Sequence, residues 1–310
     1  MTVPERPPFD RELEILLEPI LPVLAQPGGL PLPKLEDVLP YGLSHEERTL
    51  LGPDGNQVIV SIFSQKQSKS RERPSIYFIH GGGMTSGNRF STISWALQAV
   101  QEFDMVCVSI EYRLAPMHPD PEPIEDCYHG LLWTADQAKD LGIDLSRLLI
   151  AGTSAGGGLA AGVALLARDR GGPRILGQVL SCPMIDDRNN SVSVNQFAGV
   201  GVWDREQNLH GWNALLGECR GTDKVSIYVA PGRATDLSRL PPAFIDVGST
   251  ETFRDEDIQF PQQLWQNGVQ CELHVWPGGF HAFDLLFPTA VLSLAACKAR
   301  MEWMRRLLQM

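Results

Sequence analysis

The feature that most constrains the fold of this 310-residue chain is a regular alternation of two kinds of segment from about residue 48 onward. Short runs rich in β-branched and aromatic residues predict strands, and longer stretches with helical periodicity follow most of them. The strand-like runs are apolar almost throughout, which is typical of a parallel sheet that is buried on both faces. The alternation therefore predicts an α/β fold in which helices flank a mostly parallel sheet.

The predicted elements begin with a hairpin over residues 48–64, in which Pro53-Asp54-Gly55-Asn56 supplies the turn. Six more strands are predicted at 75–80, 105–112, 147–154, 177–183, 243–249 and 271–276. Helices are predicted at 124–141, 156–168, 253–266 and about 290–310. In the last helix, the expected buried stripe consists of Leu292, Leu294, Met301, Met304 and Leu307.

Two segments do not follow the alternation. Residues 1–45 contain a short amphipathic helix, with Asp10 as its expected N-cap, and then a Pro-rich stretch. Residues 185–238 form a long insertion after the sixth strand, and so long a connection in a compact domain usually serves as a lid or binding element. We expect both segments to form one helical cap over the carboxyl ends of the strands, with the catalytic domain over 46–310.

Charge and cysteine usage exclude several classes of function. The formal net charge of −11 disfavours nucleic-acid partners and anionic membrane surfaces, which need clustered Lys and Arg. The N-terminus lacks the basic start and unbroken apolar run of a secretory signal, and no stretch is long enough to span a bilayer. Six scattered cysteines show no metal-ligand spacing, so we expect no metal and a reducing, cytoplasmic location.

The strongest local signal for chemistry is Gly152-Thr153-Ser154-Ala155-Gly156, which lies between a predicted strand and a predicted helix rich in small residues. A nucleophilic serine in such a turn needs small flanking residues because the backbone is tight and strained. The start of the helix also directs its positive dipole end toward the serine. The alternative, a Gly-rich turn that binds phosphate, would normally include a Lys, which is absent here.

A second signal is the sequence HGGG at 80–83, directly after the strand predicted at 75–80. Consecutive glycines allow backbone N–H groups to approach the oxyanion of a tetrahedral intermediate. The N–H of Ala155, the residue after the nucleophile, would complete such an oxyanion hole. A merely flexible turn is the minor alternative, and we interpret His80 itself as a structural residue.

The remaining catalytic residues should follow the serine in the order acid, then histidine. His281 is the expected general base, because it follows the last strand in a Gly-containing loop, whereas His274 lies within that strand. For the acid, Glu251 is the preferred candidate because it lies nearest the end of its strand. Asp255, one helical turn further on, and Asp246, inside the strand, stay open as alternatives.

With these residues in place, the chain resembles the hormone-sensitive-lipase-like esterases of microbes over about residues 48–310. The motifs that carry the resemblance are HGGG at 80–83, EYRLAP at 111–116, EDCYHGLLW at 125–133, GTSAGGGLAAG at 152–162, GSTETFRDED at 248–257 and GGFHAF at 278–283. The resemblance implies an α/β-hydrolase fold with an eight-stranded sheet, a helical cap and a cofactor-free esterase. It also implies Gly82, Gly83 and Ala155 as oxyanion donors. Glu251 stands where many relatives have Asp, as in a subset of the family.

The expected activity is therefore hydrolysis of short- to medium-chain or small-molecule esters through an acyl-enzyme. Lactone or amide hydrolysis and acyl transfer share the same intermediate, and a non-catalytic ligand receptor is a more remote alternative. Specificity should come from the cap, where Met84, Phe197, Trp203 and Trp212 are candidate pocket residues. The alternative for these apolar residues is that they pack the cap onto the body. The expected partner is a small ester, with a homodimer left open.

Overall fold

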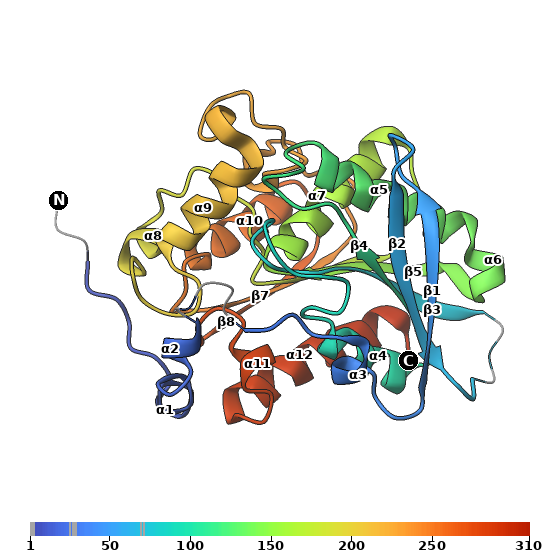
Figure 1. Cartoon of the computed structure of the whole chain (residues 1–310), viewed down its shortest axis with the longest axis horizontal. Helices are drawn as coiled ribbons and strands as arrows, with labels where there is room; N and C mark the ends of the chain where they lie inside the picture. Colours follow the sequence, from blue (N-terminus) through green and yellow to red (C-terminus); the bar gives the residue numbers. More distant parts are fainter. Residues whose placement is uncertain (1–3, 25, 27–29, 69, 71) are drawn as a thin grey trace.

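The computed structural model describes residues 4–24, 26, 30–68, 70 and 72–310. Its eight-stranded sheet has the order β1-β2-β4-β3-β5-β6-β7-β8, and only the pairs β1/β2 and β2/β4 are antiparallel (Figure 1). The mostly parallel α/β-hydrolase sheet predicted from the sequence is thus confirmed. The strands are β1 (Leu43–Leu51), β2 (Gln57–Gln65), β3 (Arg73–Ile79), β4 (Val106–Glu111), β5 (Ile143–Thr153), β6 (Gly177–Ser181), β7 (Ala243–Gly248) and β8 (Cys271–Trp276).

Helices cover both faces of the sheet. The described helices are α1 (Arg11–Leu17), α2 (Leu21–Leu24), α3 (Leu35–Val38), α4 (Ser94–Phe103), α5 (Glu122–Asp136), α6 (Ala138–Leu141), α7 (Ala155–Arg170), α8 (Val192–Gln196), α9 (Arg205–Leu216), α10 (Arg254–Gln266), α11 (Phe283–Leu286) and α12 (Val291–Leu308). Short 3-10 turns lie at Gly217–Cys219 and Pro231–Arg233. In Figure 1, α5, α7 and α10 lie on one side of the sheet, and α4 and α12 lie on the other.

Alternation along the buried strands divides the core between these two faces. In β3, Tyr77 points into the cluster that contains α5, α7 and α10. Its neighbours Ile76 and Phe78 point into the cluster that contains α4 and α12. Because successive strand side chains face opposite ways, a strand covered on both sides must be apolar throughout, which explains the unbroken apolar runs in the sequence.

Two local predictions needed correction. The helix predicted at 124–141 is divided at Gln137 into α5 and α6. In α12, Leu294 is 57% exposed rather than part of a buried stripe, while Arg300 is fully buried. The helix presents this arginine to the end of the sheet because acidic side chains there compensate its charge, a tertiary effect that apolar periodicity does not reveal.

The N-terminal segment and the insertion between β6 and β7 meet at the carboxyl end of the sheet. Gln196 donates a hydrogen bond to the Glu5 carbonyl, and a cavity of about 480 Å³ is lined by residues 6–24 together with residues 199–207. Residues 35–39, in contrast, pack against the cluster of α4 and α12. The division into a cap segment at 1–45 and a catalytic domain at 46–310 stays a prediction.

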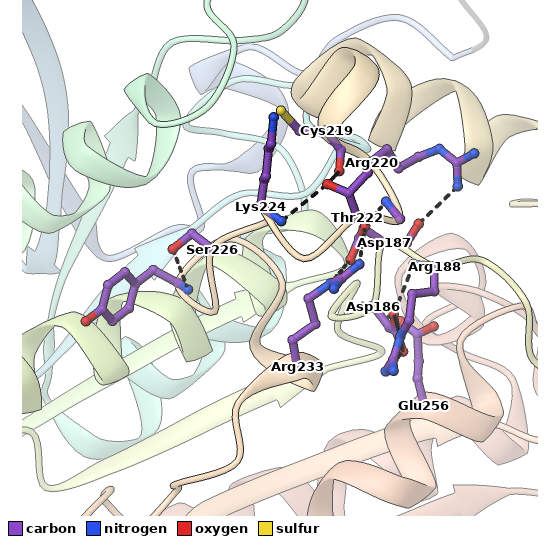
Figure 2. A network of polar contacts seen from close by, with 12 residues as sticks. Asp186, Asp187, Arg188, Cys219, Arg220, Thr222, Lys224, Ser226, Arg233 and Glu256 are labelled. Atoms are coloured by element: carbon purple, nitrogen blue, oxygen red, sulfur yellow. Dashed lines mark hydrogen bonds and ion pairs between the residues drawn. The ribbon is translucent and has the colours of Figure 1, made fainter.

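The insertion is anchored at its base by a polar network (Figure 2). Asp187 is fully buried and accepts hydrogen bonds from Arg233 and from the backbone N–H of Gly221. Glu256 of α10 accepts from the backbone N–H groups of Ile185 and Asp186 at 3.0 and 3.2 Å. These contacts tie the start of the insertion to α10 and the end of the insertion to its start. In the described part of the chain, no helix is long and apolar enough to cross a membrane.

Candidate active site

Ser154 lies in the sharp turn between β5 and α7. Its backbone has φ 59° and ψ −124°, a strained conformation for a residue with a side chain. The turn is fixed by its own backbone hydrogen bonds, since the Ser154 N–H donates to the Ser181 carbonyl at 2.9 Å and its carbonyl accepts from Met184 at 3.0 Å. The turn thus presents the serine at the carboxyl end of the sheet.

The glycines around Ser154 are required by close backbone approaches. A Cβ atom on Gly152 would lie 2.2 Å from the Gly156 carbonyl oxygen, and one on Gly156 would lie 2.1 Å from the Ile79 carbonyl oxygen. Both distances are far below van der Waals contact, so neither position accepts a side chain without moving the backbone. This is the physical reason for the Gly-x-Ser-x-Gly spacing.

Ser154, His281 and Glu251 are hydrogen-bonded in a row. The His281 Nε2 atom lies 3.0 Å from Ser154 Oγ, and its Nδ1 atom lies 3.0 Å from Glu251 Oε2. Each residue follows the carboxyl end of a different strand, β5, β7 or β8, so the parallel sheet brings together positions up to 127 residues apart. All three side chains are nearly buried.

The two alternative acids have other partners. Asp255 accepts a hydrogen bond from the backbone N–H of Ser193 and pairs with Arg254. Asp246 pairs with Arg300 at 3.0 Å. Of the three candidates, the structure therefore brings only Glu251 into hydrogen-bond contact with His281.

Burial dominates the electrostatics of this row. It raises the pKa of Glu251, and the attraction of His281 offsets part of that rise.

The Sγ atom of Cys182 lies within 4.8 Å of ligand atoms of Glu251 and His281, and three such atoms could hold a metal ion. Burial raises the pKa of the Cys182 thiol well above its usual range, and the other two side chains are bonded to each other, so the group fits a triad better than a metal centre.

The proposed oxyanion donors lie beside Ser154. Gly82 and Gly83 both have positive φ, 126° and 60°, in the loop after β3, and Ala155 is the first residue of α7. Among the described residues, none of the three backbone N–H groups donates to a protein acceptor. Free N–H groups at a helix start and in a glycine loop are suited to stabilising an oxyanion.

His80 has the structural environment that the sequence suggested. Its ring stacks on Tyr112 with the ring centroids 4.2 Å apart, and its Nδ1 atom bonds the Gly81 carbonyl at 2.7 Å. Burial lowers the pKa of His80 to about 4, so the ring is neutral at physiological pH. The neutral ring thereby holds the glycine loop in shape.

The four candidate pocket residues differ in their distance from the chemistry. Met84, Phe197 and Trp212 are fully buried, and Met84 and Trp212 belong to the main core cluster. Trp203 is only partly buried, and its ring centroid lies 6.3 Å from that of His281. Its indole also packs so closely on Gly83 that a Cβ there would lie 2.2 Å from the ring. Trp203 is therefore the member of the group that borders the reacting atoms.

Sequence reasoning missed the support of the histidine loop by the N-terminal helix. Leu13 and Leu17 of α1 pack with Phe280 and Phe283, on either side of His281 in the chain. The Asp10 N–H donates to the Gly278 carbonyl at 2.9 Å, while the Asp10 side chain caps α1 as predicted. The amphipathic pattern of α1 predicted a buried face, but it contained no signal for which loop that face would cover.

Comparison with known proteins agrees with this geometry. Residues 76–285 match a family model described as alpha/beta hydrolase fold. The chain is 32% identical to the carboxylesterase NlhH of Mycobacterium tuberculosis, an alignment that covers 92% of each protein. It is 37% identical to the esterase LipI of the same organism over 66% of this chain, and this alignment spans 63% of LipI, a little under two thirds.

Solved esterase structures are similar over almost the whole chain. A bacterial heroin esterase matches with a TM-score of 0.83 and 34% identity, and the alignment covers 98% of this chain and 94% of that one. The esterase LipW from Mycobacterium marinum matches with a TM-score of 0.81 and 29% identity, covering 98% and 92% of the two chains. The likeness thus includes the N-terminal segment and the insertion as well as the sheet.

Proposed function

The chain belongs to the α/β-hydrolase family, and from that premise we propose that it is a carboxylesterase of the hormone-sensitive-lipase-like branch that uses Ser154, His281 and Glu251 as its catalytic triad. The observation that carries the proposal is the unbroken row of hydrogen bonds from Ser154 through His281 to Glu251. The names of the similar proteins, carboxylesterase and esterase, support ester hydrolysis as the reaction.

In the first half of the reaction, Ser154 Oγ attacks the ester carbonyl carbon while its proton moves to His281 Nε2. The carbonyl oxygen becomes an oxyanion that accepts hydrogen bonds from the N–H groups of Gly82, Gly83 and Ala155. When the tetrahedral intermediate collapses, the C–O bond to the alcohol breaks and the alkoxide takes the proton from His281. The acyl group is left as an ester of Ser154.

In the second half, a water molecule attacks the acyl carbon and gives its proton to His281 Nε2. Collapse of the second tetrahedral intermediate breaks the bond to Ser154, whose oxygen recovers that proton, and the carboxylic acid leaves. Glu251 orients the imidazole and stabilises its charged form in both halves. The triad is regenerated, and the cycle needs no group beyond the residues named.

Trp203 restricts the substrate to esters with short or medium chains. Its indole covers Gly83, one of the proposed oxyanion donors, and its ring centroid lies 6.3 Å from that of His281. Ser154 is itself only 6% exposed. Val202 and Asp204, on either side of this tryptophan, line the cavity of about 480 Å³ that the N-terminal segment shares with the insertion. None of the triad residues lines that cavity, and it reaches the site only through the neighbours of Trp203 in the chain.

The proposal is tested by hydrolysis of p-nitrophenyl esters from acetate to palmitate with wild type, Ser154→Ala and Trp203→Ala. We expect wild-type activity confined to the shorter chains, its loss in Ser154→Ala, and a shift of Trp203→Ala toward longer chains because the indole no longer fills the acyl end of the site. More than residual activity in Ser154→Ala would refute the nucleophile. An unchanged chain-length profile in Trp203→Ala would refute its role in specificity.

The setting of the enzyme is part of the same proposal. All six cysteines are free thiols, which supports a reducing compartment such as the cytoplasm. The partner is a small ester, and a homodimer is compatible with the chain. Size-exclusion chromatography with light scattering would decide between monomer and dimer.

A further inference from the structure

Two buried carboxylates behind the triad each have an oxygen with no protein partner. Among the described residues, Glu251 Oε1 and Asp246 Oδ1 accept no hydrogen bond, although both side chains are at most 3% exposed. The other oxygen of each group is engaged, Glu251 Oε2 by His281 and Asp246 Oδ2 by Arg300. Burying a carboxylate oxygen without a hydrogen-bond partner costs free energy of folding, so each of these oxygens requires a partner.

Both carboxylates line the same small cavity. It has a volume of about 10 Å³ and is bordered also by Ser181, Cys182 and Asp284. The bound oxygens are occupied by His281 and Arg300, so only the unpaired oxygens are available to accept a hydrogen bond from an occupant of this space. The volume is about that needed to hold a single water molecule.

Asp246 is held firmly from its far side. Arg300 of α12 donates to Asp246 Oδ2 at 3.0 Å and to Asp284 at 2.9 Å, and the Trp276 indole N–H also donates to Asp246 Oδ2, at 3.2 Å. Arg300 is itself fully buried and stacks over Trp95 with 4.8 Å between the guanidinium carbon and the ring centroid. Asp246 is thus held on β7 by two donors, whereas Glu251 has a hydrogen-bond partner on only one of its two carboxylate oxygens.

The occupant of the cavity must donate hydrogen bonds in two directions. Ionised carboxylates are acceptors only, so two of them cannot satisfy each other. A water molecule has two O–H donors and fits the measured volume. Burial raises the pKa of both carboxyls, and the charge of Asp246 raises that of Glu251 further, which makes a neutralising or bridging donor between them more valuable.

We propose that one buried water molecule bridges Glu251 Oε1 and Asp246 Oδ1, and that Asp246 is thereby the positioning residue for the triad acid. This inference rests on the proposed function, in which Glu251 orients His281. The support then runs without a break from Arg300 on α12 through Asp246, the water and Glu251 to His281 and Ser154. The C-terminal helix, on the opposite side of the sheet from α7, thus acts on the geometry of the active site.

The need for such a bridge follows from the choice of acid. Glutamate has one more rotatable bond than aspartate, so its carboxylate can turn away from the imidazole more easily. A hydrogen bond to the second oxygen fixes the plane of the carboxylate and keeps Oε2 directed at His281 Nδ1. A chain that uses glutamate as the triad acid gains the most from a fixed neighbour of this kind.

The direct test is a high-resolution crystal structure of the Ser154→Ala protein, in which the groups behind the triad are unchanged. We expect a peak of water density within hydrogen-bond distance of both oxygens. An empty cavity, or the two carboxylates in direct contact through a shared proton, would overturn the proposal. This readout does not depend on activity, so it remains informative even if Ser154 is not the nucleophile.

The kinetic test compares Asp246→Ala, Asp246→Asn and the control Asp255→Asn. We expect kcat of Asp246→Ala to fall about tenfold with KM nearly unchanged, because the cavity does not contact substrate and lost outer-shell support of an oriented histidine costs about this much. The asparagine variant can still accept from Arg300 and donate to the water, so it should fold normally and lose less. The control removes a nearby carboxylate that does not line the cavity, and its kcat should not change.

The pH profile separates positioning from a purely structural role. Removal of the Asp246 charge makes a positive charge on the triad less favourable, so the acidic limb of kcat/KM should move to lower pH in Asp246→Asn and stay in place in Asp255→Asn. If Asp246→Asn lowered the melting temperature but changed neither kcat nor the acidic limb of the kcat/KM profile, Asp246 would have only a structural role. That result would overturn the proposal. Full activity in Ser154→Ala would instead overturn the proposed function and leave the water to be judged by the crystal structure.

Discussion

At the scale of single residues, the active site depends on backbone conformations and approaches that ordinary side chains do not allow. Ser154 is held at positive φ by hydrogen bonds on both sides of the turn, and the flanking glycines are in contact with backbone carbonyls. The strain is stored in the strand–helix turn and offset by the packed elements around it. The serine oxygen is therefore placed before any substrate arrives, which is what a preorganised nucleophile needs.

The assignment of the acid is testable by paired isosteric changes. Glu251→Gln should lower kcat/KM by about 10²–10⁴-fold, because an amide neither fixes the imidazole correctly nor stabilises its charge. Asp255→Asn should leave kcat/KM unchanged, since Asp255 bonds the Ser193 backbone instead of His281. Steady-state kinetics on p-nitrophenyl acetate would measure both. If Asp255→Asn were the more damaging change, Glu251 would not be the triad acid.

At the scale of secondary-structure elements, helices from both ends of the chain support the loops and strand ends of the site. Helix α1 packs on the loop that carries His281, and α12 supplies the arginine that fixes Asp246. The small residues of helix α7 allow neighbouring backbone to approach it closely. A Cβ atom on Gly162, for example, would lie only 1.8 Å from the Tyr228 carbonyl oxygen. The catalytic loops are short, so their order depends on these neighbours rather than on contacts of their own.

The contribution of α1 can be measured with two substitutions on its opposite faces. Leu13→Ala should reduce the free energy of unfolding by about 2–4 kcal/mol, as buried leucine truncations generally do. It should also reduce kcat for the smallest ester, because the loop of His281 loses its support. Ile15→Ala, at a side chain that is 59% exposed, should change stability by about 0.5 kcal/mol or less. Equal effects of the two variants in denaturant unfolding would contradict the bracing role.

At the scale of the whole molecule, a neutral buried histidine makes the fold sensitive to acid. The pKa of His80 is about 4 in the folded protein and 6.5 ordinarily, so the unfolded chain binds the additional proton between these values. Stability from this residue is complete above pH 6.5, falls as the pH drops from about 6.5 to about 4, and then levels off. Buried acids such as Glu256, whose pKa burial raises well above its usual range, act in the opposite direction.

The contribution of His80 to acid sensitivity is therefore measured by comparing the pH dependence of the stability of wild type with that of a variant that lacks the histidine. Between pH 7 and pH 4, wild type should lose roughly 3 kcal/mol more stability than His80→Gln, because glutamine does not titrate and the pKa difference of the histidine corresponds to about that free energy. Urea unfolding at several pH values would measure both slopes. Parallel slopes would show that His80 is not responsible for the acid sensitivity.

The sequence by itself determined the class of fold and predicted the nucleophile. Strand and helix periods are local properties, and they located most strands of the sheet to within about four residues, including β8 at its observed bounds. The exception is β1, which begins at Leu43, before the predicted hairpin and inside the segment expected to belong to the cap. The Gly-x-Ser-x-Gly turn and the glycine loop at 80–83 are likewise dictated by steric limits within a few residues. Such features are readable because their causes lie close together in the chain.

Only the tertiary structure shows which side chains lie beside each candidate acid. The sequence favoured Glu251 over Asp255 and Asp246 only by its position near the end of its strand. The folded chain places His281 beside Glu251, Ser193 beside Asp255 and Arg300 beside Asp246. Arg300 and Asp246 are 54 positions apart, and Trp203 and Gly83 are 120 positions apart. Helix α1 and the histidine loop come from opposite ends of the chain. Side-chain chemistry determines which interactions a residue can make, and the tertiary packing determines which partner lies close enough to make them.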